Sequence, residues 1–194
     1  ELRTRIDELF GTLPATGKRF VVSEIVPKGA GITKVIEKQI PQSLIVLGHA
    51  GIKRSNPDWY AATLVTHVLG GGGLSSRLYE EVREKRGLAY SVSAYLNPME
   101  HSAIVAGGTA TQNARAGESL EVIRAEWRKV AEKGISAREL AEVKDYMNGS
   151  FPLRLGSSRE IANTLVGVRL SRLDIGYLSR RAEIRSEEHT SELQ

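Results

Sequence analysis

The chain has 194 residues, of which 41% are hydrophobic and 26% charged, and its net charge is +4. These values predict a soluble globular protein of about one domain and exclude a disordered chain. No apolar run approaches the roughly 20 residues of a membrane-spanning helix, and the absence of cysteine excludes disulfides, thiolate metal sites and cysteine nucleophiles.

The N-terminal part predicts a helix followed by a linker. Apolar residues recur at helical spacing over 2–10, and a glycine and a proline follow them. We interpret residues 1–13 as the remnant of an upstream domain. Residues 14–31 contain two prolines and three glycines, which predicts an inter-domain linker with one short extended piece at 20–25.

Strands and helices then alternate. Alternating side chains predict a strand at 33–39, and the β-branched run SLIVLGH predicts a buried strand at 43–49. The pair Asn56-Pro57 predicts the start of a helix that runs to about Leu69. A second helix is expected over 74–86, with its inward residues at Leu78 and Val82.

The second half predicts a hairpin and further helices. Residues 90–96 and 102–111 are expected to form paired strands joined by a turn around Asn97-Pro98. A helix over 114–133 carries an apolar stripe, and capping boxes at Ser136 to Glu139 and Ser157 to Glu160 open the helices that follow. The last of these directs Ile161, Leu165 and Val168 inward. The pattern predicts an α+β fold, a mainly antiparallel sheet packed against helices on one face.

Metal and nucleic-acid sites are not indicated. The histidines at 49, 67, 101 and 189 include no pair at i, i+4, so the HExxH and HxxEH motifs are both absent. No helix therefore offers the two histidines with which such motifs hold zinc. Lysine and arginine are interleaved with glutamate through every element, as on solvated helix faces, and we expect no nucleic-acid binding.

Gly70, Gly71, Gly72 and Gly73 form a run of four glycines between two predicted helices. The lysine that a P-loop requires does not follow them, so a phosphate cradle is not supported. Two interpretations stay open, a helix end with a flexible connector and a loop that contacts peptide.

Arg83, in the last turn of its predicted helix, and Tyr90, at the start of the next strand, are candidate functional residues. Gly87 lets the chain reverse between them, which can bring the guanidinium and the phenol together. Two such donors can bind a substrate carbonyl or stabilise a developing oxyanion. The alternative is that Arg83 pairs with Glu80 or Glu84 on the surface and that Tyr90 packs in the sheet.

The segment SSRLYEEVREKRGLAYSV, residues 75–92, resembles the second-domain signature of the insulinase, or pitrilysin-like, metallopeptidase family M16. The similarity continues through the four glycines, the following hairpin, LAEVKDYMNGSFPLRL and IANTLVGVRL, and covers about residues 20–184. It implies that residues 32–184 form the C-terminal domain of a clamshell peptidase built from homologous α+β domains, with the LuxS/metallohydrolase-like fold.

The resemblance also implies roles for single residues. In that family one domain binds zinc through HxxEH and a distal glutamate, and the facing domain supplies an arginine and a tyrosine seven residues apart. Arg83 and Tyr90 match that pair, which implies that they hydrogen-bond the substrate and stabilise the tetrahedral intermediate formed by zinc-bound water. Arg86 lies four residues from Tyr90 and does not match. Gly70 to Gly73 resemble a shortened form of the peptide-handling loop of mitochondrial processing peptidases.

The chain departs from the family pattern because it has no zinc ligands. We therefore expect it to hold no cofactor itself, and zinc to lie on a partner M16 domain that carries HxxEH. That partner is either the upstream half of the same chain or a separate subunit of a two-subunit bacterial enzyme, and residues 96–126 are more similar to the second type. The expected substrate is a peptide and the expected compartment is the bacterial periplasm or cytoplasm.

Another possibility within the family is a structural or docking subunit without chemistry, as in the core proteins of respiratory complexes. Those proteins tend to lose the arginine and the tyrosine that this chain keeps.

The C-terminal end has two unusual features. Residues 185–194 read RSEEHTSELQ, and one permitted set of codons for them spells the start of a widely used sequencing-library adapter. We expect this tail to be translated adapter. The domain before it stops short of the family's closing helix and last strand, so we expect a truncated domain with an open sheet edge and poor stability.

Overall fold

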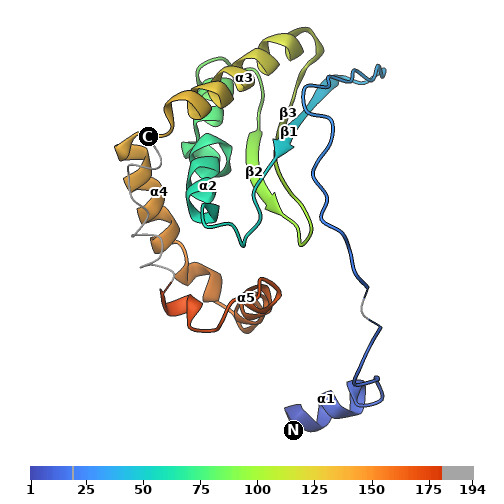
Figure 1. Cartoon of the computed structure of the whole chain (residues 1–194). Coiled ribbons are helices and arrows are strands. Elements are labelled where there is room, and N and C mark those ends of the chain that lie inside the picture. The colour runs from blue at the N-terminus through green and yellow to red at the C-terminus, as the bar shows by residue number, and fades with distance from the viewer. Residues whose placement is uncertain (19, 181–194) are drawn as a thin grey trace.

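A three-stranded antiparallel sheet forms the centre of the computed structural model, which describes residues 1–18 and 20–180. Its strands are β1 (Gln42–Ala50), β2 (Val92–Pro98) and β3 (Ala103–Gln112), in the order β1-β3-β2 (Figure 1). The predicted hairpin is confirmed as β2 and β3. The expected adapter tail and the end of the predicted domain lie outside the described residues.

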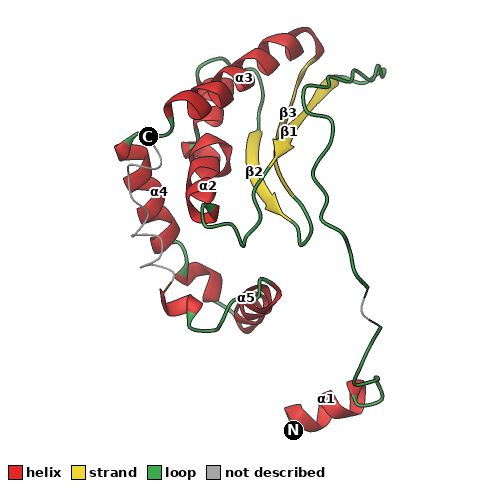
Figure 2. Ribbon diagram, viewed as in Figure 1, coloured by secondary structure: helices red, strands yellow, loops and turns green. Residues whose placement is uncertain are grey.

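Helices cover one face of this sheet (Figure 2). α2 (Trp59–Thr66) and α3 (Ala116–Lys133) contact the strands, α4 (Ala137–Gly149) contacts α2, and α5 (Ser158–Leu170) follows. This arrangement confirms the α+β prediction. Among the described residues, no helix is both long and apolar enough to cross a membrane.

Short helices of other types connect these elements. η1 (His67–Gly71) and η3 (Tyr79–Glu84) are π-helical, whereas η2 (Gly73–Ser75), η4 (Asn113–Arg115) and η5 (Pro152–Leu155) are 3-10 turns. The continuous helix expected over 74–86 is therefore divided into a 3-10 turn and a π-helical turn. π-Helical turns are rare and are found frequently at functional sites.

Two apolar clusters hold the helices in place. One lies between α2 and α4 and contains Leu64, Val68, Leu140 and Val143. The other lies between the sheet and α3, and it contains Leu78 and Val82, as predicted. Burial of such a side chain stabilises the fold by about 1.5–3 kcal/mol.

The helix termini follow the predicted caps in part. Ser136 and Glu139 form a complete capping box at the start of α4. Ser157 Oγ accepts from the Glu160 N–H at the start of α5. On α5, however, only Val168 is buried, and the expected inward residues Ile161 and Leu165 are exposed.

The outer face of the sheet is exposed. Val46 on this face is 75% exposed, whereas Val92 on the helix-covered face is 7% exposed. The strand predicted at 43–49 is present as β1, but the prediction that it is buried is wrong. β-Branched residues favour any pleated strand, including an edge strand with one solvated face.

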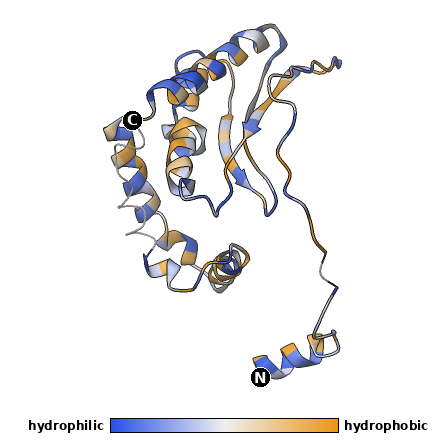
Figure 3. Cartoon of the chain, in the orientation of Figure 1, coloured by the Kyte–Doolittle hydropathy of each residue, from blue (hydrophilic) through white to orange (hydrophobic). Residues whose placement is uncertain are grey.

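The segment before β1 has no regular secondary structure, so the strand predicted at 33–39 is wrong. Residues 20–25 form no ladder either. They contact the hairpin at His101, whose carbonyl accepts from the Ile25 N–H (2.8 Å) and whose Nδ1 lies 3.5 Å from Glu24 Oε1. Strand propensity produces a strand only where the backbone finds a partner. Several apolar side chains of this segment are exposed as a result, among them Val35 and Ile36. Hydrophobic residues appear along this segment in Figure 3.

α1 (Leu2–Phe10) confirms the first predicted helix. It lies at the far end of the linker, away from the sheet (Figure 1), and none of its residues is buried. Its apolar side chains Leu2, Ile6, Leu9 and Phe10 are all exposed.

Candidate functional site

The turn between η3 and β2 carries both candidate residues. Gly87 has a φ of +57°, a backbone region that favours glycine, and its N–H donates to the Arg83 carbonyl (2.9 Å). The Leu88 N–H donates to the Val82 carbonyl (2.8 Å), which closes the end of the helix. The chain therefore reverses at Gly87, as predicted.

This reversal brings Arg83 and Tyr90 together. The Arg83 Cζ lies over the Tyr90 ring, 4.5 Å from its centre. Tyr90 is 80% exposed, so the competing expectation that it packs in the sheet is wrong. The expected surface pair is present only loosely, because Glu84 Oε1 is 3.9 Å from Arg83 Nε, beyond hydrogen-bond distance.

Tyr79 is a third member of this group that sequence reasoning missed. The Arg83 Cζ lies over its ring as well, 4.9 Å from the centre. Tyr79 precedes Arg83 by four residues, the spacing at which helical side chains meet, and this was the available signal.

The polar atoms of the pair remain open to a ligand. Within the part of the chain that the structure describes, no acceptor lies at hydrogen-bond distance from the Arg83 guanidinium, and none from the Tyr90 hydroxyl. A guanidinium has five N–H donors, and a cation–π contact pairs none of them with an oxygen acceptor. The arrangement therefore offers a fixed cation and a phenol to an oxygen acceptor.

Arg86 is held differently from Arg83. Its Nη1 donates to the Glu81 carbonyl (2.8 Å) and also to the Glu81 carboxylate. Lys85 donates to the same carboxylate, and these hydrogen bonds lower the pKa of Glu81. The geometry thus agrees with the spacing, which matches Arg83 and not Arg86 to the arginine of the family pair.

Two threonines of β3 hold the backbone that carries Tyr90. Thr109 Oγ1 donates to the Ser91 carbonyl and Thr111 Oγ1 donates to the Leu88 carbonyl, each at 2.6 Å. Both threonines are buried, and Ser119 Oγ of α3 donates to Thr111 Oγ1 (3.0 Å). We call this pair of threonine hydrogen bonds to the segment 88–91 the threonine clamp. Nothing in the local sequence pattern indicated it, because it depends on how β3 faces the segment 88–91.

The four glycines do not form one loop. Gly70 and Gly71 belong to η1, and Gly70 is buried. A Cβ at Gly70 would lie 2.4 Å from the Ala94 backbone nitrogen, so close packing against β2 requires glycine there. The peptide-contacting interpretation is narrowed to residues 71–73, of which Gly73 has a φ of +57°.

The described residues do not fit a zinc site. No group of three or more histidine, cysteine, aspartate or glutamate side chains in that part of the chain could hold a metal ion. His49 accepts from Trp127 Nε1 (3.1 Å), and His67 packs on the Tyr146 ring with its pKa lowered by burial. His101 lies 3.5 Å from Glu24. Each described histidine therefore has a separate structural environment.

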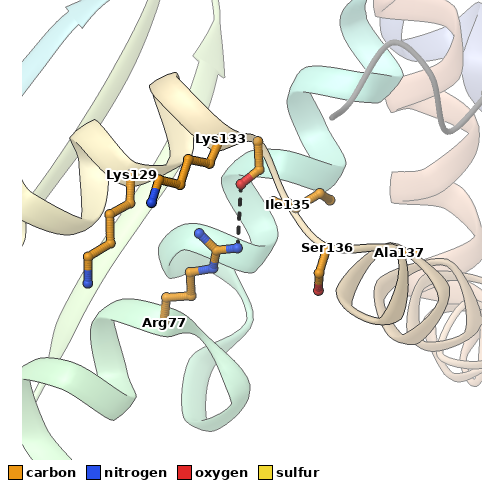
Figure 4. A pocket seen from close by; sticks show the side chains of 7 residues that line it. Arg77, Lys129, Lys133, Ile135, Ser136 and Ala137 are labelled. Atoms are coloured by element: carbon orange, nitrogen blue, oxygen red, sulfur yellow. Dashed lines mark hydrogen bonds between the residues drawn. The ribbon is translucent and has the colours of Figure 1, made fainter.

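A hollow of about 560 Å³ lies between α3 and the start of α4 (Figure 4). Basic side chains line it, but Arg77 donates to Glu139 and to the Gly134 carbonyl, and Lys129 pairs with Glu126. These charges are largely neutralised by protein groups, so the hollow is a weaker candidate than the Arg83 group.

Comparison with known proteins gives a consistent result. The family model described as the peptidase M16 inactive domain matches residues 1–147. An uncharacterised zinc protease of Streptomyces coelicolor is 31% identical over 152 residues, or 78% of this chain and 32% of that protein. An uncharacterised zinc protease of Bacillus subtilis is 32% identical over 156 residues, which is 79% of this chain and 37% of that protein. The chain spans about a third of the length of these relatives.

Solved structures share the fold. A peptidase M16 inactive domain from Pseudomonas fluorescens aligns with a TM-score of 0.70 and 28% identity, over 78% of this chain and 36% of that one. A protease from Helicobacter pylori aligns with a TM-score of 0.81 and 20% identity, over 99% of this chain and 47% of that one.

Proposed function

The chain belongs to the peptidase M16 family as its inactive domain, and from this we propose that Arg83 and Tyr90 bind peptide substrate for a zinc-bearing M16 domain. The observation that carries the proposal is the contact between the two residues. The Arg83 guanidinium lies over the Tyr90 ring at 4.5 Å, and no described acceptor lies within hydrogen-bond distance of the donors of either residue.

The chemistry that suits this pair is stabilisation of negative charge on a carbonyl oxygen. Peptide hydrolysis places negative charge on the oxygen of the attacked carbonyl, and fixed donors aimed at that oxygen lower the barrier. Arg83 supplies N–H donors with a permanent positive charge, and Tyr90 supplies a neutral O–H donor. Neither residue can act as the nucleophile or the base in this scheme, so the pair needs a facing domain that activates water.

That facing domain is the proposed partner. The relatives are named zinc proteases, and the described residues of this chain do not form a zinc site. We place the HxxEH zinc site on a separate M16 subunit, with the upstream half of the same chain as the alternative. The bacterial periplasm or cytoplasm is the proposed compartment.

The domain boundaries are part of the proposal. We assign residues 1–13 to an upstream domain, 14–31 to a linker, 32–184 to the M16 domain and 185–194 to translated adapter. The exposed apolar face of α1 supports the first assignment, because an amphipathic helix requires a surface that covers this face. The glycines at 71–73, of which Gly71 and Gly73 are exposed, are proposed to contact the peptide.

The test is peptide turnover by the complete enzyme, containing this domain and its zinc-bearing partner. Arg83→Ala and Tyr90→Phe should each lower kcat/KM by about 10²-fold or more, by analogy with lost oxyanion donors. Arg138→Ala is the control, because the Arg138 side chain is 84% exposed on α4. Unchanged turnover in both variants would favour a docking subunit without a chemical role.

A further inference from the structure

We infer that Tyr79 is a positioning residue for Arg83, and that its aromatic ring, not its hydroxyl, is the part that acts. This inference rests on the proposed function, because it explains how the guanidinium is kept ready for substrate. Its basis is the second ring contact, in which the Arg83 Cζ lies 4.9 Å from the centre of the Tyr79 ring.

Tyr90 alone is a weak support for the guanidinium. It is 80% exposed, and no described group holds its hydroxyl. An arginine side chain has many rotamers, and a single contact with an exposed ring leaves most of them accessible. A second ring contact from a different element reduces the number of orientations available to the guanidinium.

Tyr79 is better placed to restrict Arg83. It is half-buried, and it begins the π-helical turn that contains Arg83 four residues later. Its backbone follows the buried Ser76, whose Oγ accepts from the Tyr79 N–H (3.4 Å). The neighbouring Leu78 and Val82 are fully buried against the sheet, so the ring projects from a firmly packed stretch of chain.

The two rings restrain Arg83 without using its donors. The attraction between a cation and the face of a ring does not pair the N–H groups of the guanidinium with an oxygen acceptor. A hydrogen-bonded carboxylate would restrain the side chain too, but it would occupy those donors. Glu84 Oε1, at 3.9 Å from Arg83 Nε, is too distant to form such a bond. Arg86, which is tied to Glu81, shows this second mode a few residues away.

The Tyr79 hydroxyl has no described hydrogen-bond partner, so the effect of losing the ring can be measured apart from the effect of losing the hydroxyl. In the complete enzyme, Tyr79→Phe keeps the ring and should hold kcat and KM within about twofold. Tyr79→Leu keeps apolar volume but loses the ring, and should lower kcat about tenfold with KM nearly unchanged, because the ordered guanidinium acts in the transition state. Tyr95→Leu is the matched control, since Tyr95 is a partly exposed tyrosine of β2 with no ring contact to Arg83.

A readout independent of catalysis is the mobility of the Arg83 Nε–H in ¹⁵N-arginine-labelled complete enzyme. Arg83→Lys identifies the resonance by its disappearance. Tyr79→Leu should make this group more mobile, and Tyr79→Phe should not.

The outcomes separate the two proposals. Full turnover in Arg83→Ala overturns the proposed function itself. A different result overturns only the role of Tyr79. In that result Arg83→Ala loses turnover, whereas Tyr79→Leu keeps a normal kcat and an unchanged mobility of the Arg83 Nε–H. Loss of kcat in Tyr79→Phe also overturns it, because the Tyr79 hydroxyl, and not its ring, would then be the part that acts.

Discussion

Arg77 and Glu139, which are 62 residues apart, form a two-pronged ion pair: Nε donates to Oε1 at 2.6 Å and Nη2 donates to Oε2 at 2.7 Å. Glu139 also accepts from the backbone N–H and the hydroxyl of Ser136, both at 2.7 Å. One carboxylate thus joins the start of α4 to the stretch that leads into η3. These bonds, that from Arg77 first, lower the pKa of Glu139 to about 2.

The first prediction concerns acid stability. Glu139 has a pKa of about 2 in the folded chain and an ordinary value of 4.5, so its stabilising effect is complete above about pH 4.5 and is lost as the pH falls toward 2. Glu139→Gln should lower the free energy of unfolding at pH 7 by about 1–2 kcal/mol, a figure reduced for partial solvent screening. Urea unfolding between pH 2 and pH 7 measures this difference.

Its control is Glu142→Gln on the same helix, which removes an exposed pair with Arg138 at 3.6 Å. Exposed pairs contribute about 0–1 kcal/mol, so this variant should show little change at any pH. Equal pH profiles for the Glu139 and Glu142 variants would contradict the assignment.

The second prediction concerns Gly70. A Cβ at this position would lie 2.4 Å from the Ala94 nitrogen and 2.7 Å from the Ala94 Cβ, so Gly70→Ala should cost about 1–3 kcal/mol through overpacking. At Gly71 the nearest atoms lie at 3.5 Å, an ordinary contact, so Gly71→Ala should be nearly neutral. Thermal unfolding of both variants tests whether close packing requires glycine at position 70 but not at position 71.

The third prediction concerns the threonine clamp. Thr111→Val keeps the shape of the side chain but leaves the Leu88 carbonyl and the Ser119 hydroxyl without their partner, at a cost of about 1–3 kcal/mol. Amide hydrogen exchange should increase over residues 88–91, where Tyr90 lies. Thr66→Val is the control, because Thr66 donates to a carbonyl of its own helix and should cost less. Unchanged exchange over 88–91 would show that the clamp does not hold this segment.

Sequence reasoning could place Arg83 and Tyr90 together because the relationship is local. A helix end, a glycine with positive φ and a following strand fix the approach of residues seven apart, and the structure agrees. Tyr79 was within reach of the same reasoning, through its i, i+4 spacing. The threonine clamp was not, because Thr111 and Leu88 are 23 residues apart and meet only when β2 and β3 pair.

The errors have a common cause, which is that strand formation and burial depend on partners. The residues at 33–39 have strand-forming side chains, yet no strand pairs with them. Val46 is β-branched and lies in a strand, yet it faces solvent because the helices cover only the other face. The divided helix at 73–84 is a further example, since local propensity does not distinguish a π-turn from an α-turn.

The clamp has a consequence for the motion of the site. Thr109 and Thr111 belong to β3, the strand with a neighbour on each side, so segment 88–91 cannot loosen without disturbing the middle of the sheet. The backbone beneath Tyr90 therefore opens in the same cooperative unit as the sheet, although its ring stands in solvent. The backbone of this surface segment is therefore expected to open only when the sheet opens.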